Sequence, residues 1–203
     1  MSKKIFVSLA AVMFLAAAAA EASAQDVVMN SAETINPGNV KLAFFPTVLF
    51  GKNGSDRLWG AAGRVGIGIT SRFDVEAKAA IFKGLKYLGA DAELWFIHGK
   101  NFNGSAALGV HMTNLQPGED SRGFDTTLLF SHRPVQRLEI YGGFKFAYDW
   151  VNNSDRRLAM MHLVPGLEFR VTDDIDFLAE FGIGLNDNAR HYASVGLALY
   201  LFR

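Results

Sequence analysis

The stretch from residue 73 to residue 82, FDVEAKAAIF, decides the fold. Apolar and polar positions alternate along it: Phe73, Val75, Ala77, Ala79 and Ile81 against Asp74, Glu76, Lys78 and Ala80. A period of two places these sets on opposite faces of one β-strand. The stretch therefore predicts a strand with an uncharged face and a charged one.

A second stretch, from Leu138 to Asp149, repeats the alternation over a greater length. Strands of soluble proteins usually run for about 5–6 residues, whereas a tilted strand that crosses a bilayer needs about 9–11. After the first residues of the chain, no apolar run approaches the length of a membrane-spanning helix. Any membrane span in this chain must then be a β-strand.

The same reading divides the chain into ten strands and predicts a single closed antiparallel transmembrane β-barrel. Tight connections alternate with longer ones rich in Gly, Asn and Asp, as periplasmic turns alternate with outer loops. A very short outer loop at Phe82–Gly84 and a long turn from Ser131 to Arg137 leave eight or twelve strands open. The expected strands are 39–50, 58–70, 73–82, 86–97, 102–112, 124–131, 138–149, 158–171, 175–185 and 191–202.

The first residues have the composition of an export signal. Lys3 and Lys4 precede an apolar run from Ile5 to Ala20, and Ala22-Ser23-Ala24 fits the small-residue site of a signal peptidase. The alternative is a retained anchor helix, for which the run is short. We expect a signal peptide over 1–24, a short periplasmic lead over 25–38, either free or capping the barrel, and the barrel over 39–203.

The composition of the chain limits which partners and which kinds of site we expect. Basic and acidic residues balance at 20 each, so no basic stripe indicates a nucleic-acid partner. The chain has no Cys, which excludes disulfides and thiolate zinc sites. The five His residues never fall two apart on one strand, so we expect no metal site, and we expect no cofactor.

The uncharged strand faces fit a lipid environment. An exposed charge near the bilayer midplane would cost about 2–4 kcal/mol, and these faces carry none. The opposite faces are rich in glycine, which suits a narrow, curved interior better than a solvated sheet, although Pro46 and Pro165 argue against a closed barrel because each lacks an N–H donor. Six aromatic residues are expected at the inner lipid interface: Phe73, Phe96, Phe102, Phe130, Phe169 and Phe177.

The strand faces opposite the uncharged ones predict a charged lumen with more acid than base. One hypothesis is a structural network of paired charges, and the other is a narrow water-filled passage whose acidic lining favours cations. The candidate lumen residues are Lys41, Arg64, Asp74, Glu76, Lys78, Asp91, Glu93, Asp125, Glu139, Lys145, Glu168, Arg170, Asp176 and Glu180.

Together with the signal peptide, the absence of Cys and the amphipathic strands, the final stretch VGLALYLF (195–202) resembles that of a small bacterial outer-membrane β-barrel. The resemblance implies an outer-membrane location, lipid and the barrel-assembly machinery as partners, and passage of small ions or solutes. In such barrels the closing strand usually ends in an aromatic residue of the lipid-facing set. Here Phe202 is the penultimate residue, and Leu197, Leu199 and Leu201 alternate out of phase with Tyr200 and Phe202. The register of the last strand stays open.

We expect a non-enzymatic protein, either a narrow porin-like channel or a structural or surface-interaction component of the envelope. One alternative is a barrel enzyme that acts on lipid or peptide at the outer rim. Its candidate residues are His191 and Ser194, whose spacing puts them on opposite faces of a strand. The other alternative is a secreted lipocalin-like protein that binds a ligand.

Overall fold

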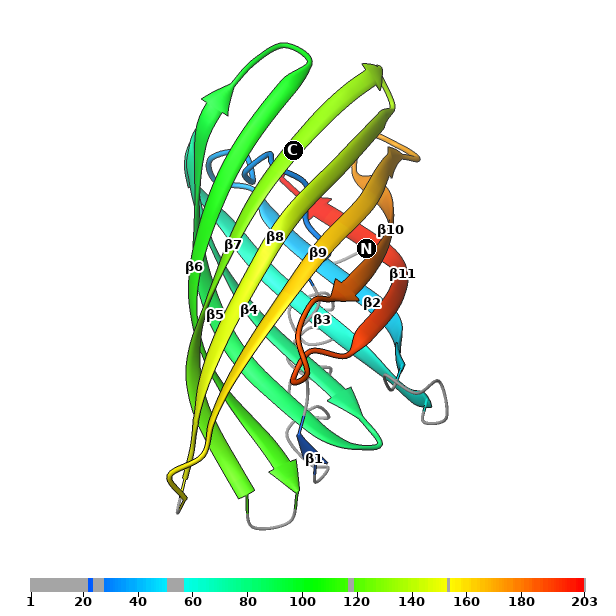
Figure 1. Ribbon diagram of the computed structural model, residues 1–203. Coiled ribbons are helices and arrows are strands. Elements are labelled where there is room, and N and C mark those ends of the chain that lie inside the picture. Colours follow the sequence, from blue (N-terminus) through cyan, green and yellow to red (C-terminus); the bar gives the residue numbers. More distant parts are fainter. Residues whose placement is uncertain (1–21, 24–27, 51–56, 117–118, 153, 203) are drawn as a thin grey trace.

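A closed barrel of ten antiparallel strands makes up most of the chain (Figure 1). The computed structural model describes residues 22–23, 28–50, 57–116, 119–152 and 154–202. Among the described residues, no helix is long and apolar enough to cross a membrane. The barrel strands are β2 (Val40–Phe50), β3 (Arg57–Thr70), β4 (Phe73–Phe82), β5 (Gly84–His98), β6 (Phe102–Gln116), β7 (Glu119–Val135), β8 (Leu138–Val151), β9 (Arg157–Arg170), β10 (Ile175–Gly184) and β11 (His191–Leu201).

Each barrel strand pairs with its neighbours in the chain, and β11 pairs with β2 to close the barrel. The predicted fold class is therefore confirmed, with ten strands. A further strand, β1 (Ala22–Ser23), pairs in parallel with the start of β5. It falls within the expected signal peptide, the rest of which lies outside the described residues.

The two predicted connections from Thr113 to Gly123 and from Ser131 to Arg137 are shorter than expected. Strand β6 continues to Gln116, and β7 begins at Glu119 and continues to Val135. The backbone ladder between β6 and β7 continues through Asn114, opposite Asp120, although polar side chains had marked this stretch as a loop. The short outer loop is confirmed, since Gly84 adopts φ +77°, a conformation that suits glycine in a tight turn.

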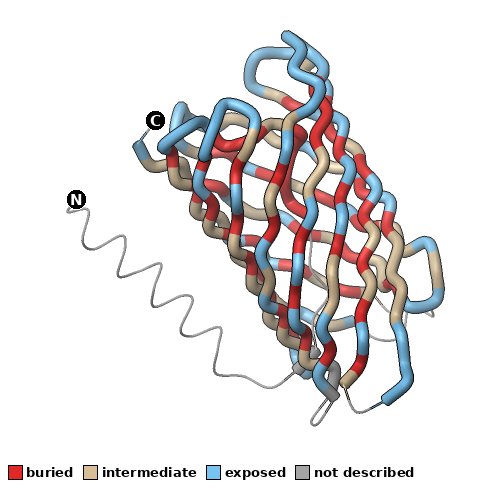
Figure 2. The backbone as a smooth tube through the Cα atoms, turned by 90° about the vertical axis from the view of Figure 1, so that its left-hand side faces the viewer, coloured by how far each residue is buried: buried red, intermediate tan, exposed pale blue. Residues whose placement is uncertain are grey.

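Exposure alternates along the strands because one face looks into the barrel and the other outward (Figure 2). On β4, Asp74, Glu76 and Lys78 are buried, whereas Val75 between them is exposed. In a closed barrel the buried face must be the lumen. The uncharged face is the outer surface, so the apolar side chains do not meet across two stacked sheets.

Pro46 and Pro165 lie in gaps of the hydrogen-bond ladder rather than at the rims. The β2–β11 pairing is interrupted around Pro46, and the β9–β10 pairing is interrupted around Pro165. On their other sides, Pro46 pairs with Ala61 and Pro165 with Gly142. The hydroxyl of Ser194 donates to the Pro46 carbonyl oxygen at 3.2 Å, which satisfies an acceptor beside the gap. A closed barrel thus accommodates both prolines.

The register of the last strand is settled by exposure along β11. Val195 and Leu197 are about half exposed, whereas Tyr192, Ser194 and Ala198 are buried. The apolar series of this strand therefore faces lipid, and Tyr200 shares the inward phase with Tyr192. The closing strand thus keeps a leucine face outward instead of an aromatic one.

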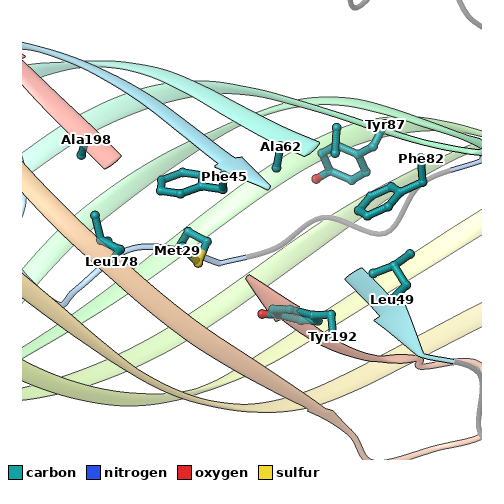
Figure 3. Close-up of a cluster of buried hydrophobic side chains, with 10 residues drawn as sticks. Met29, Phe45, Leu49, Ala62, Phe82, Tyr87, Leu178, Tyr192 and Ala198 are labelled. Carbon is teal, nitrogen blue, oxygen red and sulfur yellow. The ribbon is translucent and has the colours of Figure 1, made fainter. Parts of the chain in front are cut away.

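The hydrophobic core occupies the lumen. One cluster gathers large side chains from opposite walls, among them Phe45, Leu49, Tyr87 and Tyr192, around Met29 (Figure 3). Inward glycines make room for these rings: a Cβ atom on Gly182 would lie 1.9 Å from Cε1 of Tyr192. Glycine is required there because the ring lies against the backbone of the neighbouring strand.

Candidate functional site

The outer surface presents an apolar belt with aromatic side chains at both ends of the strands. Of the predicted interface residues, Phe73 is half-buried and Phe96, Phe102, Phe130, Phe169 and Phe177 are exposed. The rings of Phe102 and Phe130 stack with centroids 6.0 Å apart. A second aromatic group, which the sequence analysis missed, lies near the outer ends of β7 and β8: Phe124, Phe146, Tyr148 and Trp150.

The lumen holds a part of the chain that belongs to no barrel strand. Residues 28–39, here called the inner segment, precede β2, and Val28, Met29, Ala32 and Ile35 in it are at most 4% exposed. The sequence predicts a short periplasmic lead over 25–38, either free or capping the barrel. The structure instead places the described part of that lead, up to Ile35, among the lumen side chains, because its N–H groups find carboxylate acceptors there.

Glu180 on β10 is the point where the inner segment is held most tightly. The backbone N–H of Val28 donates to its Oε1 at 3.0 Å, and that of Met29 donates to its Oε2 at 2.7 Å. Two hydroxyls donate to the same carboxylate, Tyr192 at 2.5 Å and Tyr141 at 2.9 Å. Hydrogen bonds to an ionised carboxylate are about twice as strong as neutral ones, so this contact anchors the segment.

Two further carboxylates bind the inner segment nearer the end where β2 begins. The N–H of Ile35 donates to Oδ2 of Asp74 at 2.7 Å, and Nδ2 of Asn30 donates to Oε2 of Glu93 at 2.5 Å. The Oδ1 of Asn30 accepts from Nζ of Lys41 at 2.7 Å. Together with the Glu180 contacts, these buried hydrogen bonds join the segment to β2, β4, β5 and β10.

At that end of the barrel, an ionic contact and a short backbone bridge complete the docking. Oε1 of Glu33 accepts from Nδ2 of Asn103 at 2.9 Å and lies 2.6 Å from NH2 of Arg133. Arg133 also pairs with Glu139 at 2.7 Å. The N–H of Gly38 donates to the carbonyl of Gly68 at 2.9 Å. This end also carries the short turns, and we refer to it as the periplasmic end.

Ion pairs form a continuous network along β2 to β5, strands that also carry part of the apolar cluster, and reach β7. Nζ of Lys41 and NH1 of Arg64 bind the two oxygens of Glu76 at 2.9 and 2.8 Å. Nζ of Lys78 bridges Asp91 at 2.9 Å and Asp125 at 2.7 Å. Arg64 lies 3.8 Å from Asp91 and so joins the two groups.

The network continues toward the outer end through His111. Its Nδ1 contacts Asp125 at 2.9 Å, and its Nε2 contacts Asp149 at 2.6 Å. The hydroxyl of Ser121 donates to Asp149 at 2.9 Å. Asp149 was not among the predicted lumen residues, although its inward phase on the stretch 138–149 was visible in the sequence.

Twelve of the fourteen predicted lumen residues are buried, and Glu168 and Arg170 are half-buried. The structure brings them together in groups rather than in one ring. Lys41, Arg64, Glu76, Lys78, Asp91 and Asp125 form the ion-pair network, whereas Asp74, Glu93 and Glu180 bind the inner segment. Glu139 pairs with Arg133, Arg170 lies 3.8 Å from Asp176, and Lys145 is buried in the wall.

His191 and Ser194 do not meet. Nδ1 of His191 accepts from the N–H of Gly184 at 3.1 Å, whereas Oγ of Ser194 lies 2.7 Å from Oγ1 of Thr47. The hypothesised pair of base and nucleophile is not formed in this arrangement. Within the described part of the chain, no group of three or more His, Asp or Glu side chains is arranged to hold a metal ion.

The closed wall, the apolar belt and the charged lumen define the fold class: the chain forms a small β-barrel with the features of a transmembrane barrel. No protein-family model matches the sequence, and a search of curated proteins gave no match.

A comparison with solved structures finds similar β-barrels. An outer-membrane channel from Pseudomonas putida F1 aligns with a TM-score of 0.57 at 8% identity, over 87% of this chain and 100% of that one. The KdgM porin aligns with a TM-score of 0.46 at 10% identity, over 80% of this chain and 99% of that one. The N-terminal barrel domain of Pseudomonas aeruginosa OprF aligns with a TM-score of 0.39 at 12% identity, over 82% of this chain and 100% of that one. The first of these alignments shows a shared fold.

Proposed function

We propose that the protein is a non-enzymatic outer-membrane channel whose passage is occupied, in this structure, by its own inner segment. One observation carries the proposal: the lumen accommodates a stretch of main chain in addition to the side chains of the wall. When the segment leaves, a lumen of that width becomes a passage lined by the charged network and by the wall side chains of the apolar cluster.

The barrel wall does not depend on the inner segment for its closure. All ten strands pair with one another, and the segment adds a single isolated bridge, from Pro37 to Gly68. Its other polar contacts are made to side chains of the lumen. Departure of the segment would therefore leave the wall's hydrogen-bond ladder intact, which is what a gate requires.

A locked segment gives the sharpest test, because the chain has no Cys of its own. The variant Glu33→Cys/Asn103→Cys places one thiol on the segment and one on β6, at side chains that hydrogen-bond to each other. A short bifunctional thiol reagent then tethers the segment inside the lumen. We expect ion conductance across a planar bilayer before the reaction and its loss after it.

The two single-Cys variants serve as matched controls, since each takes up the reagent without forming a tether. Unchanged conductance after complete cross-linking would show that the segment does not close the passage. The envelope-structural alternative predicts no conductance in any form, including a Glu180→Ala variant in which the segment is held less tightly. Absence of conductance in every form would contradict the proposal that the protein is a channel.

The proposal also includes the partners expected from the sequence. Outer-membrane lipid would surround the exposed apolar belt, and the barrel-assembly machinery would insert the chain. The exposed side chains of Leu108 (64%) and Val110 (66%) support the lipid contact. No observation on the described residues favours the enzyme or the lipocalin-like alternative over the channel.

A further inference from the structure

We propose that Asp74 and Glu93 form a binding site for cations that carry N–H donors, such as alkylammonium or guanidinium groups, and that these solutes compete with the inner segment for it. The inference rests on the proposed channel and names its solute class. Within the described part of the chain, neither carboxylate forms an ion pair with a basic side chain of the wall.

Asp74 and Glu93 lie directly opposite each other in the register of β4 and β5. Both side chains point into the lumen, and the residues are 1% and 3% exposed. Like charges opposite one another on paired strands destabilise the pair. Burial makes the repulsion larger because little solvent separates the two groups. Two ionised carboxylates at this position would carry an electrostatic cost that a cation relieves.

The basic residues nearby are already bound to another carboxylate. Lys41 and Arg64 both bind Glu76, two residues along β4 from Asp74. Asp74 and Glu93 accept hydrogen bonds from uncharged donors of the inner segment, the Ile35 N–H and the Asn30 amide, and the Ser105 hydroxyl also lies beside Glu93. Oδ1 of Asp74 and Oε1 of Glu93 are buried and have no hydrogen-bond partner. Each carboxylate thus keeps one oxygen available to a donor.

The inner segment itself shows the chemistry that the site accepts, since it binds through N–H groups. An ammonium or guanidinium group supplies the same donors and adds the positive charge that the pair lacks. Such charge-assisted hydrogen bonds are roughly twice as strong as neutral ones. A chelated metal ion fits less well, because among the described residues no group of three His, Asp or Glu has a metal-binding arrangement.

The test uses the full-length protein with one reporter, Ala32→Cys, on the inner segment. Ala32 is fully buried, so its thiol reacts with a small water-soluble reagent only when the segment leaves the lumen. The rate of modification is measured in methylammonium chloride and in tetramethylammonium chloride at equal concentration. Both ions carry one charge, but only methylammonium has N–H donors.

We expect methylammonium to accelerate the modification about tenfold relative to tetramethylammonium, the ratio that corresponds to one hydrogen bond to a charged group. Asp74→Asn and Glu93→Gln should each reduce this ratio toward one. Asp155→Asn, which removes an exposed acidic charge outside the lumen, should leave it unchanged. Equal rates in the two salts, or a ratio that survives both lumen substitutions, would overturn the inference.

The outcome separates this inference from the proposed function. A protein that conducts and closes on cross-linking, yet shows equal rates in the two salts, is a channel without this site. A methylammonium effect in a protein with no conductance would support the binding site but contradict the proposal that the protein is a channel. The comparison of the two salts needs no variant at Asp74 or Glu93, so it holds even where a substitution prevents folding.

Discussion

The backbone N–H of Met29 donates a 2.7 Å hydrogen bond to Oε2 of Glu180, a residue 151 positions further along the chain. The acceptor lies on β10, the ninth of the ten barrel strands in chain order. The donor belongs to the residues that precede the first barrel strand. The inner segment can therefore reach this position only in a barrel that already holds β10.

Removal of the Glu180 carboxylate should destabilise the protein. In Glu180→Ala, two backbone N–H groups and the hydroxyls of Tyr141 and Tyr192 lose a buried acceptor. One buried unsatisfied donor costs about 1–3 kcal/mol, so we expect a loss of at least about 2 kcal/mol in the free energy of unfolding. Urea unfolding in lipid vesicles measures it. Glu180→Gln keeps one acceptor oxygen and should lose less, and equal losses in both variants would contradict the role of the acceptor.

Glycine at position 182 should be required by the ring of Tyr192. An added Cβ would lie 1.9 Å from that ring, whereas at Gly142 nothing lies within 4 Å. Gly182→Ala should therefore cost about 1–3 kcal/mol through overpacking, and Gly142→Ala should be close to neutral. The midpoints of thermal unfolding of the two variants provide the comparison. A Gly182→Ala protein as stable as Gly142→Ala would show that the ring moves away freely.

Lys78 should be indispensable to the network in the lumen wall. Its Nζ bridges Asp91 and Asp125, and Lys78→Met leaves both carboxylates without that cation. Loss of one partner of a buried ion pair costs about 3–5 kcal/mol. Lys83→Met, in the exposed outer loop, should change the free energy of unfolding by less than about 0.5 kcal/mol. Similar stability of the two variants in urea would mean that the network contributes little.

The outer face of β6 should tolerate small apolar residues but not a charge. Leu108 is 64% exposed in the middle of this strand. In a bilayer, Leu108→Arg should cost about 2–4 kcal/mol, because the charge is placed in hydrocarbon. Folding into phosphatidylcholine vesicles, with Leu108→Ala as the matched control, measures this cost. An Arg variant that folds as readily as the Ala variant would place this face in water.

The barrel could be predicted from the sequence because the alternation of apolar and polar residues is a local property of each strand. In the stretch 73–82 each residue's face follows from its parity, so Asp74 and Lys78 point inward and Val75 outward without reference to any partner. The number of strands follows from the same alternation and the turn residues between stretches. Twelve of the predicted lumen residues are buried for this reason.

The ends of β6 and β7 could not be predicted in the same way. Polar residues such as Asn114 and Asp120 indicate a loop when each is considered alone, but they pair across the hairpin where the strands rise above the rim. The register of β11 was also open, because its leucines and aromatics alternate with each other. Only pairing with β2 decided which set faces lipid.

The sequence by itself determined that alternate residues face lipid and an enclosed charged interior, since strand periodicity needs no knowledge of distant contacts. Only the tertiary structure decided what fills that interior. Residues 28–39 have no periodicity that indicates their place, and Asn30 and Ile35 bind carboxylates 63 and 39 positions away. Only the folded barrel brings such donors and acceptors together, so the occupied lumen is a property of the tertiary structure and not of any local stretch.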